Sequence, residues 1–190
     1  MTIDDGRVSW VYIMYVRMPS ERIGAAIGPN GETKREIERR TSTKLIFDSE
    51  TGSVKIEAGN DPLGALKAEN ILKAIARGFS SQRAFRLLDD DQFLEVLDIT
   101  DFAGDSERAI SRLKGRVIGE QGKTRETIER MTDTYVSIYG KTIATIGSAE
   151  QLAVAREAIE MLLSGREHST VYRFLDRKRK EAKESRRIVR

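Results

Sequence analysis

The chain contains 190 residues, of which 39% are hydrophobic and 33% are charged, enough for one large domain or two small ones with buried cores. It has no cysteine and one histidine, which excludes disulfides, thiolate catalysis, cysteine-ligated zinc and any site that needs two histidine ligands. No apolar run approaches the roughly 20 residues that cross a bilayer, and the N-terminus lacks the pattern of a secretory signal. We therefore expect a soluble cytoplasmic protein with no membrane partner.

The net charge of +3 conceals a segregation of charge along the chain. Residues 173–190 hold nine Lys/Arg against three Asp/Glu, whereas residues 88–107 hold eight Asp/Glu and no Lys/Arg. The basic segment favours binding to a phosphate polymer.

The first half of the chain predicts a mixed α+β unit. Residues 8–16 are rich in β-branched and aromatic residues and predict a strand that ends before Pro19. A short helix begins near Ser20 and stops at residues 28–31, because two glycines and a proline cannot continue a regular helix. A second helix starts at Gly31 and points Ile37 inward.

Two short strands are then predicted at residues 45–47 and 54–56. Asp61-Pro62 begins a longer helix. Its apolar residues recur at helical spacing and are expected to pack in the core: Ala68, Ile71, Leu72, Ile75 and Phe79. The order of elements is therefore β-α-α-β-β-α.

The second half repeats this order, with a strand at 93–99, helices at 106–118 and 123–131, and strands at 135–139 and 142–146. Its closing helix places four apolar residues on one face: Leu152, Ala155, Ile159 and Leu162. A shift of 91 residues aligns ten identical pairs, which indicates two copies of one unit: Gly24, Ile27, Gly28, Gly31, Thr33, Ile37, Glu38, Arg39, Thr41 and Thr43 with Gly115, Ile118, Gly119, Gly122, Thr124, Ile128, Glu129, Arg130, Thr132 and Thr134.

The repeated element with the clearest chemistry is Ile-Gly-x-x-Gly between two helices. Its glycines let the backbone turn sharply and let a phosphodiester chain approach without meeting a Cβ. The start of the second helix adds amide donors and a partial positive charge. Lys34 in the first copy, and Lys123 and Arg125 in the second, can add phosphate contacts.

This arrangement resembles the KH domain, in which a GxxG loop within a β-α-α-β-β-α unit clamps about four single-stranded nucleotides. The resemblance implies an α+β fold of two tandem type I KH domains with a basic C-terminal helical tail. It places domain one at residues 1–79, a linker helix and acidic turn at 80–92, domain two at 93–168 and the tail at 169–190. We expect the polar second half of the tail to be mobile or dependent on a partner.

The segments at residues 79–91 and 168–172 narrow the resemblance to the archaeal members of the tandem-KH pre-ribosomal RNA processing family, whose eukaryotic relative is the partner of the Nob endonuclease. Membership implies binding to single-stranded RNA near the three-prime end of small-subunit rRNA, beside a processing endonuclease or other assembly factors, without enzymatic activity or cofactor. The implied RNA contacts are Ile27, Gly28, Pro29, Asn30, Gly31 and Lys34, and Arg116, Ile118, Gly119, Glu120, Gln121, Gly122, Lys123 and Arg125.

The loops depart from the family pattern, because KH loops often carry a basic residue between the glycines. Here Pro29-Asn30 and Glu120-Gln121 stand in that place, and Glu120 should repel a phosphate unless its side chain turns to solvent. We expect modest affinity from each domain, recovered by linking two of them, with the first loop the weaker binder.

Several alternatives stay open. A KH subunit that recruits RNA to a degrading or processing enzyme complex is the second function considered. The carboxylates between Asp89 and Asp105 could hold Mg²⁺ for a nuclease, although helix caps and turns account for them better. Packing suits His168 better than catalysis. Core positions, rather than base stacking, are expected for three aromatic residues: Trp10, Tyr12 and Tyr15. Ile27 and Ile118 are expected to serve as both core and groove floor.

Overall fold

The computed structural model describes residues 2–4, 7–9 and 12–188. Contacts within the chain divide it into two units, Met1–Asp90 and Asp91–Arg190. Within the described residues, no helix combines the length and the apolar character needed to cross a membrane.

Unit 1 contains a three-stranded antiparallel sheet in the order β3-β5-β4, preceded by a short β1–β2 hairpin. In chain order its elements are β1 (Thr2–Asp4), β2 (Arg7–Ser9), β3 (Tyr12–Arg17), α1 (Ser20–Ile27), η1 (Pro29–Gly31), α2 (Glu32–Thr41), β4 (Thr43–Asp48), β5 (Ser53–Ala58), α3 (Pro62–Ala76), α4 (Ser81–Ala84) and η2 (Phe85–Leu88). The strand predicted at 8–16 is thus divided between β2 and β3, and part of it lies outside the described residues.

Unit 2 has the same topology, with the antiparallel order β6-β8-β7. Its elements are β6 (Phe93–Asp98), α5 (Thr100–Ala103), α6 (Glu107–Ile118), η3 (Glu120–Gly122), α7 (Lys123–Thr132), β7 (Tyr135–Tyr139), β8 (Thr142–Gly147), α8 (Ala149–Leu163) and α9 (His168–Ile188). The predicted α+β fold with two β-α-α-β-β-α units is confirmed. The short helix α5, whose start is held by hydrogen bonds from Thr100 to Asp98, was not predicted.

The apolar stripes predicted for the closing helices form the two cores. In α3, Ile71, Leu72 and Ile75 are fully buried, and in α8, Ala155 and Leu162 are fully buried. These helices pack with the other helices of their units and with the apolar faces of the sheets. Since burial of a large aliphatic side chain contributes about 1.5–3 kcal/mol, these stripes fix the position of the helix pair that holds each loop.

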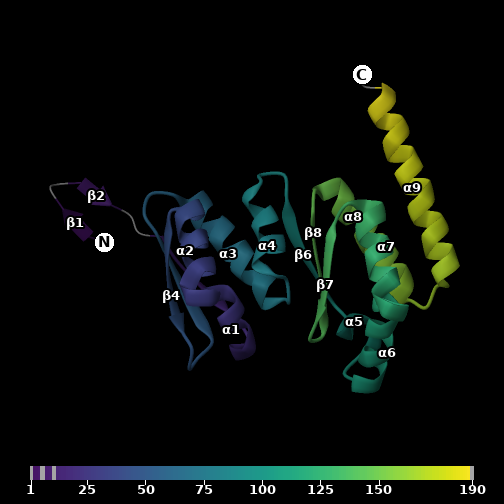
Figure 1. The fold of residues 1–190 in the computed structure, drawn as a ribbon, viewed down its shortest axis with the longest axis horizontal. Helices are drawn as coiled ribbons and strands as arrows, with labels where there is room; N and C mark the ends of the chain where they lie inside the picture. The colour runs from purple at the N-terminus through teal and green to yellow at the C-terminus, as the bar shows by residue number, and fades with distance from the viewer. Residues whose placement is uncertain (1, 5–6, 10–11, 189–190) are drawn as a thin grey trace. The chain divides into compact units, whose positions relative to one another are not determined.

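The repeat extends one helix further than the sequence alone indicated. In unit 1 the segment α4–η2 follows α3 and packs back on it, and in unit 2 the helix α9 follows α8 and packs on α7 and α8 (Figure 1). A shift of 87 residues aligns the buried Ala84 and Leu87 with the buried Val171 and Phe174. The segment expected to be a linker helix therefore packs in unit 1 as the counterpart of α9.

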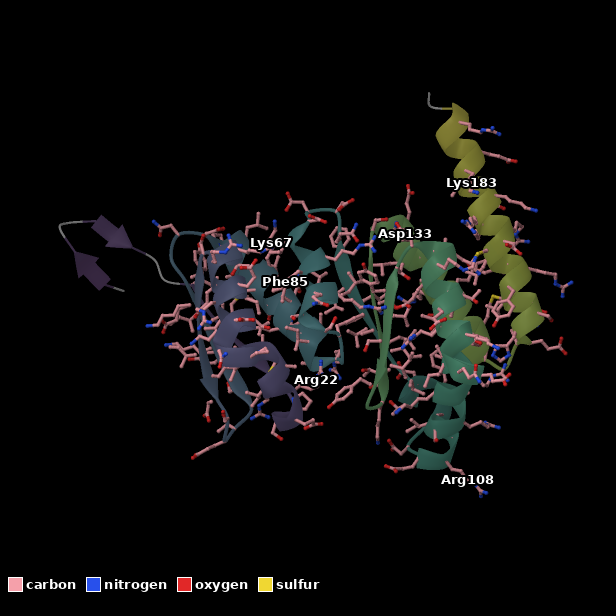
Figure 2. All side chains as sticks on the ribbon, viewed as in Figure 1. Arg22, Lys67, Phe85, Arg108, Asp133 and Lys183 are labelled. Carbon is pink, nitrogen blue, oxygen red and sulfur yellow. The ribbon has the colours of Figure 1, made fainter. Side chains whose placement is uncertain are left out.

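The helix α9 is apolar on one side only over its first part. Val171, Phe174 and Leu175 are buried in the core of unit 2, whereas the described side chains after Leu175 are mostly exposed. Figure 2 shows Lys183 on the part of α9 that extends beyond α7 and α8. The basic tail is thus a helix that unit 2 anchors through its first two turns.

The core positions expected for Tyr12 and Tyr15 are wrong. Their exposed fractions are 46% and 64%, and Trp10 lies outside the described residues. Because side chains alternate along a strand, burial of Val16 places Tyr15 on the opposite face of the sheet. Tyr12 is the first residue of β3, where the sheet ends.

Candidate nucleic-acid interface

The two Ile-Gly-x-x-Gly segments form nearly identical loops. The first glycines have φ/ψ of 73°/173° at Gly28 and 72°/176° at Gly119. The last two residues of each loop are left-handed, with φ of 50° and 77° at Asn30 and Gly31 and 52° and 81° at Gln121 and Gly122. Two separate stretches of sequence therefore fold into the same turn.

The first glycine of each loop is required by packing. A Cβ on Gly28 or Gly119 would lie 2.8 Å from the backbone nitrogen of Thr33 or Thr124, respectively, and would overlap the side chain of that threonine. The backbone N–H of each first glycine also donates to a carbonyl four residues earlier in the preceding helix, at 2.8 Å. These glycines hold the two helices together at the loop.

The second glycine of each loop is open to its surroundings. A Cβ on Gly122 would meet only the ends of the Arg125 and Glu126 side chains, at 3.8 and 3.9 Å. A Cβ on Gly31 would meet only the end of Arg35, at 3.2 Å. A flexible side chain can move, so only the positive φ favours glycine here, and the exposed side of the turn stays accessible to a ligand backbone.

A third glycine pair leaves space one turn before each loop. Gly24 in α1 and Gly115 in α6 are exposed, and a Cβ at either would meet nothing within 4 Å. Glycine inside a helix costs about 1 kcal/mol relative to alanine, and contacts with the described residues do not require glycine at these positions. The bare helix surface beside each loop therefore suits close approach of another molecule.

Two repeated threonines in each unit stabilise the fold away from the loop. Thr41 donates to the Ile37 carbonyl at 2.7 Å and shares a hydrogen bond with Thr43, and Thr132 and Thr134 repeat this pattern in unit 2. These bonds join the end of α2 or α7 to the strand that follows. Two of the ten identical pairs that reveal the repeat thus serve the scaffold of the site.

The second loop carries the cations predicted for it. Lys123 is exposed at the start of α7, and Arg125 is half-buried beside Gly122. Arg125 Nη2 lies 3.8 Å from Glu126 Oε1, and its buried Nε has no hydrogen-bond partner within the described residues. This donor is therefore available to an acceptor that approaches the loop.

The first loop has less unpaired positive charge beside it than the second loop. Glu32 stands where unit 2 has Lys123, and Lys34 lies 3.9 Å from Glu38. Arg35 lies beside Gly31, a cation near this loop that sequence reasoning missed. The acidic Glu32 and the paired Lys34 agree with the expectation that the first loop binds less strongly.

Farther along α2, charged side chains form ion pairs with one another. The carboxylate of Glu36 accepts hydrogen bonds from Arg39 and Arg40, which lower its pKa. Both arginines lie in the last turn of α2, at the opposite end of this helix from the first loop.

The residues between the glycines point outward. Pro29, Asn30, Glu120 and Gln121 are exposed, so the Glu120 carboxylate lies in solvent. Ile27 and Ile118 are half-buried. These two side chains border the loops and remain partly accessible to solvent.

The side chain of Arg116 joins α6 to the backbone at the end of α8. Its Nε donates to the Leu162 carbonyl at 2.9 Å and its Nη2 to the Arg166 carbonyl at 2.6 Å. Arg22 donates in the same way to the Ile75 and Phe79 carbonyls at the end of α3. Arg116 thus holds the end of α8, where its Nε and Nη2 groups are already engaged.

The acidic segment makes structural contacts. Asp90 pairs with Lys67 at 2.6 Å, and Asp98 accepts hydrogen bonds from Thr100. Within the described residues, no three His, Cys, Asp or Glu side chains gather in a way that could hold a metal ion.

Comparison with known proteins places these two loops in a family. A eukaryotic-type KH domain (type I) model matches residues 93–180, and a general KH domain model matches residues 13–74. The chain is 44% identical to KH domain-containing protein MJ0443 of Methanocaldococcus jannaschii over 92% of this chain and 77% of that protein. The chain belongs to the tandem-KH family of PNO1 and archaeal Dim2p.

Other relatives support the assignment. RNA-binding protein PNO1 of Oryzias latipes is 35% identical over 68% of this chain, which spans 55% of that protein. Among solved structures, Dim2p from Pyrococcus horikoshii matches with a TM-score of 0.82 and 47% identity, over 87% of this chain and 99% of that one. Protein APE0754 from Aeropyrum pernix, of unknown function, matches with a TM-score of 0.89 and 46% identity, over 94% and 96% of the two chains.

A further solved structure contains nucleic acid. It is the complex of a/eIF2alpha, aDim2p and rRNA from Pyrococcus horikoshii, which matches with a TM-score of 0.85 and 46% identity over 90% of this chain and 96% of that one.

Proposed function

We propose that this protein binds single-stranded RNA near the three-prime end of small-subunit rRNA during ribosome assembly and pre-rRNA processing, in the cytoplasm. It acts as a binding module without catalysis, and a processing endonuclease or other assembly factors act beside it.

The observation that carries this proposal is the geometry of the second loop. It combines an accessible glycine turn, the free end of α7, the exposed Lys123 and an Arg125 donor with no partner in the described chain. Backbone amides, a helix N-terminus and cations together favour a phosphodiester chain. KH domains use this arrangement to grip single strands, and the aDim2p relative occurs in a complex with rRNA.

The test is fluorescence anisotropy with a labelled single strand that matches the three-prime end of small-subunit rRNA. Tighter binding of this strand than of a scrambled strand supports the proposal, and equal binding contradicts the proposed target. Incubation of the same strand with the protein and Mg²⁺ or Mn²⁺ should leave it intact. Cleavage that Asp98→Asn abolishes would contradict the absence of catalysis.

A further inference from the structure

A groove of about 520 Å³ lies where α6, the second loop, α7 and the first turn of α9 meet. Gly119 and Glu120 belong to both the loop and the groove, so the two are continuous. The full lining is Arg112, Gly115, Arg116, Gly119, Glu120, Lys123, Thr124, His168 and Tyr172.

The groove lies on a different side of α7 from Arg125. Glu129, one helical turn after Arg125, accepts a hydrogen bond from the Val136 backbone in β7, so this face of α7 is turned toward the sheet. Thr124 is on the other face and bonds to Tyr172 of α9 at 3.0 Å. A strand that crosses the loop at Gly122 can therefore continue past Gly119 into the groove.

Charge distinguishes this groove from the corresponding surface of unit 1. At three positions of the repeat a cation in the second copy replaces an acidic or neutral residue of the first: Arg112, Arg116 and Lys123 replace Glu21, Ala25 and Glu32. Arg116 is engaged with carbonyls, but Arg112 and Lys123 are exposed and make no hydrogen bond or ion pair within the described chain. Two free cations against one carboxylate, Glu120, favour an anionic ligand.

Two aromatic rings form the wall that α9 contributes. The rings of His168 and Tyr172 are 6.2 Å apart at 61°. Hydrogen bonds fix both of them, one between the hydroxyls of Tyr172 and Thr124 at 3.0 Å and one between His168 Nε2 and the Arg116 carbonyl oxygen at 2.9 Å. Fixed aromatic faces beside cations are the elements with which proteins stack nucleic-acid bases without reading their sequence.

We propose that this groove binds one nucleotide of the RNA strand directly beyond the segment held by the second loop. Arg112 and Lys123 contact its phosphate, and the rings of His168 and Tyr172 contact its base. This inference rests on the proposed RNA binding and extends it from the loop to α9. The helix that follows the KH unit thus supplies part of the binding surface.

The test compares strands of two lengths, about four nucleotides, which one KH unit holds, and about ten nucleotides. Arg112→Glu should weaken anisotropy-detected binding of the longer strand about tenfold and that of the shorter strand less than about twofold. Arg112→Lys should retain most of the affinity. Arg108→Glu is the matched control, since Arg108 lies on α6 one turn farther from the loop and outside the groove (Figure 2).

Two results would contradict the proposal that the groove binds a nucleotide. One is an equal reduction of affinity for both strand lengths in Arg112→Glu, and the other is an equal effect of Arg108→Glu. Circular dichroism of each variant checks the fold. If the unchanged protein bound neither strand, the proposed function itself would fail, and that result does not depend on any groove variant.

Discussion

The carboxylate of Glu129 accepts a hydrogen bond from the backbone N–H of Val136 at 2.7 Å. Glu38 makes the same bond to Leu45 in unit 1, also at 2.7 Å. Each bond joins the helix that starts at the loop, α2 or α7, to the strand that follows this helix, β4 or β7. The glutamate therefore links helix to sheet from a position more than one turn inside the helix.

Glu129→Ala should destabilise unit 2 by about 1–3 kcal/mol, because it leaves a partly buried N–H without its acceptor. Glu129→Gln keeps an acceptor oxygen and should cost less. Urea unfolding measured by circular dichroism gives both values. Equal stability of the alanine variant and the unchanged protein would show that the bond does not hold the strand.

The two glycines of the second loop should respond differently to alanine. Gly119→Ala should destabilise by more than about 2 kcal/mol, because its Cβ would overlap Thr124 at a positive φ. Gly122→Ala should cost only about 1 kcal/mol, the strain of the left-handed backbone. Thermal denaturation distinguishes them, and a reversed order would contradict the described packing of the loop.

Much of this architecture could be predicted from the sequence, because internal repetition makes each half a check on the other. Ten repeated residues fixed the loop and its flanking helices, and apolar spacing fixed the closing helices. The role of α4–η2 could not be predicted in this way, since Ala84 and Leu87 share no identity with Val171 and Phe174. Only packing shows that these segments correspond.

Side-chain roles at the site were harder to predict than its position. Arg116 is a predicted RNA contact, and the structure adds a role that the sequence did not show, since it donates to carbonyls at and after the end of α8. Folding brings three further side chains close to the loops. The faces of α2 and α6 place Arg35 and Arg112 there, and the packing of α9 on unit 2 places Tyr172 there. Tyr15 looked like a core residue because composition does not show which face of a strand is covered.

Glu32→Lys should raise RNA affinity by about twofold to tenfold, because it places a cation at the first loop where Lys123 stands at the second. The control is Glu150→Lys, which makes the same charge change on an exposed residue at the start of α8. Titration of both variants with the same labelled strand checks this. An equal gain in RNA affinity for both variants would show that net charge alone, and not its position at the first loop, causes the gain.

The tail should add affinity without selectivity. Because Phe174 and Leu175 are buried, the informative truncation removes residues 177–190, which hold eight of the nine Lys/Arg between Arg173 and Arg190. It should weaken binding to matched and scrambled strands by a similar factor and flatten the salt dependence, by about 0.7 in log–log slope for each phosphate that the tail no longer neutralises. If the preference for the matched strand disappeared at constant slope, the tail would be part of the recognition site.

The most direct test of RNA binding by the second loop is Gly122→Asp, which places a carboxylate where the phosphate chain is expected. Gly104→Asp is the matched control, because Gly104 also has a positive φ and open space around it but lies before the far end of α6. In anisotropy titrations with the matched strand, Gly122→Asp should reduce the affinity at least about tenfold, whereas Gly104→Asp should leave the affinity unchanged. The circular dichroism spectra of both variants should match that of the unchanged protein. Gly31→Asp should reduce it less. Unchanged affinity in a folded Gly122→Asp variant would contradict the account.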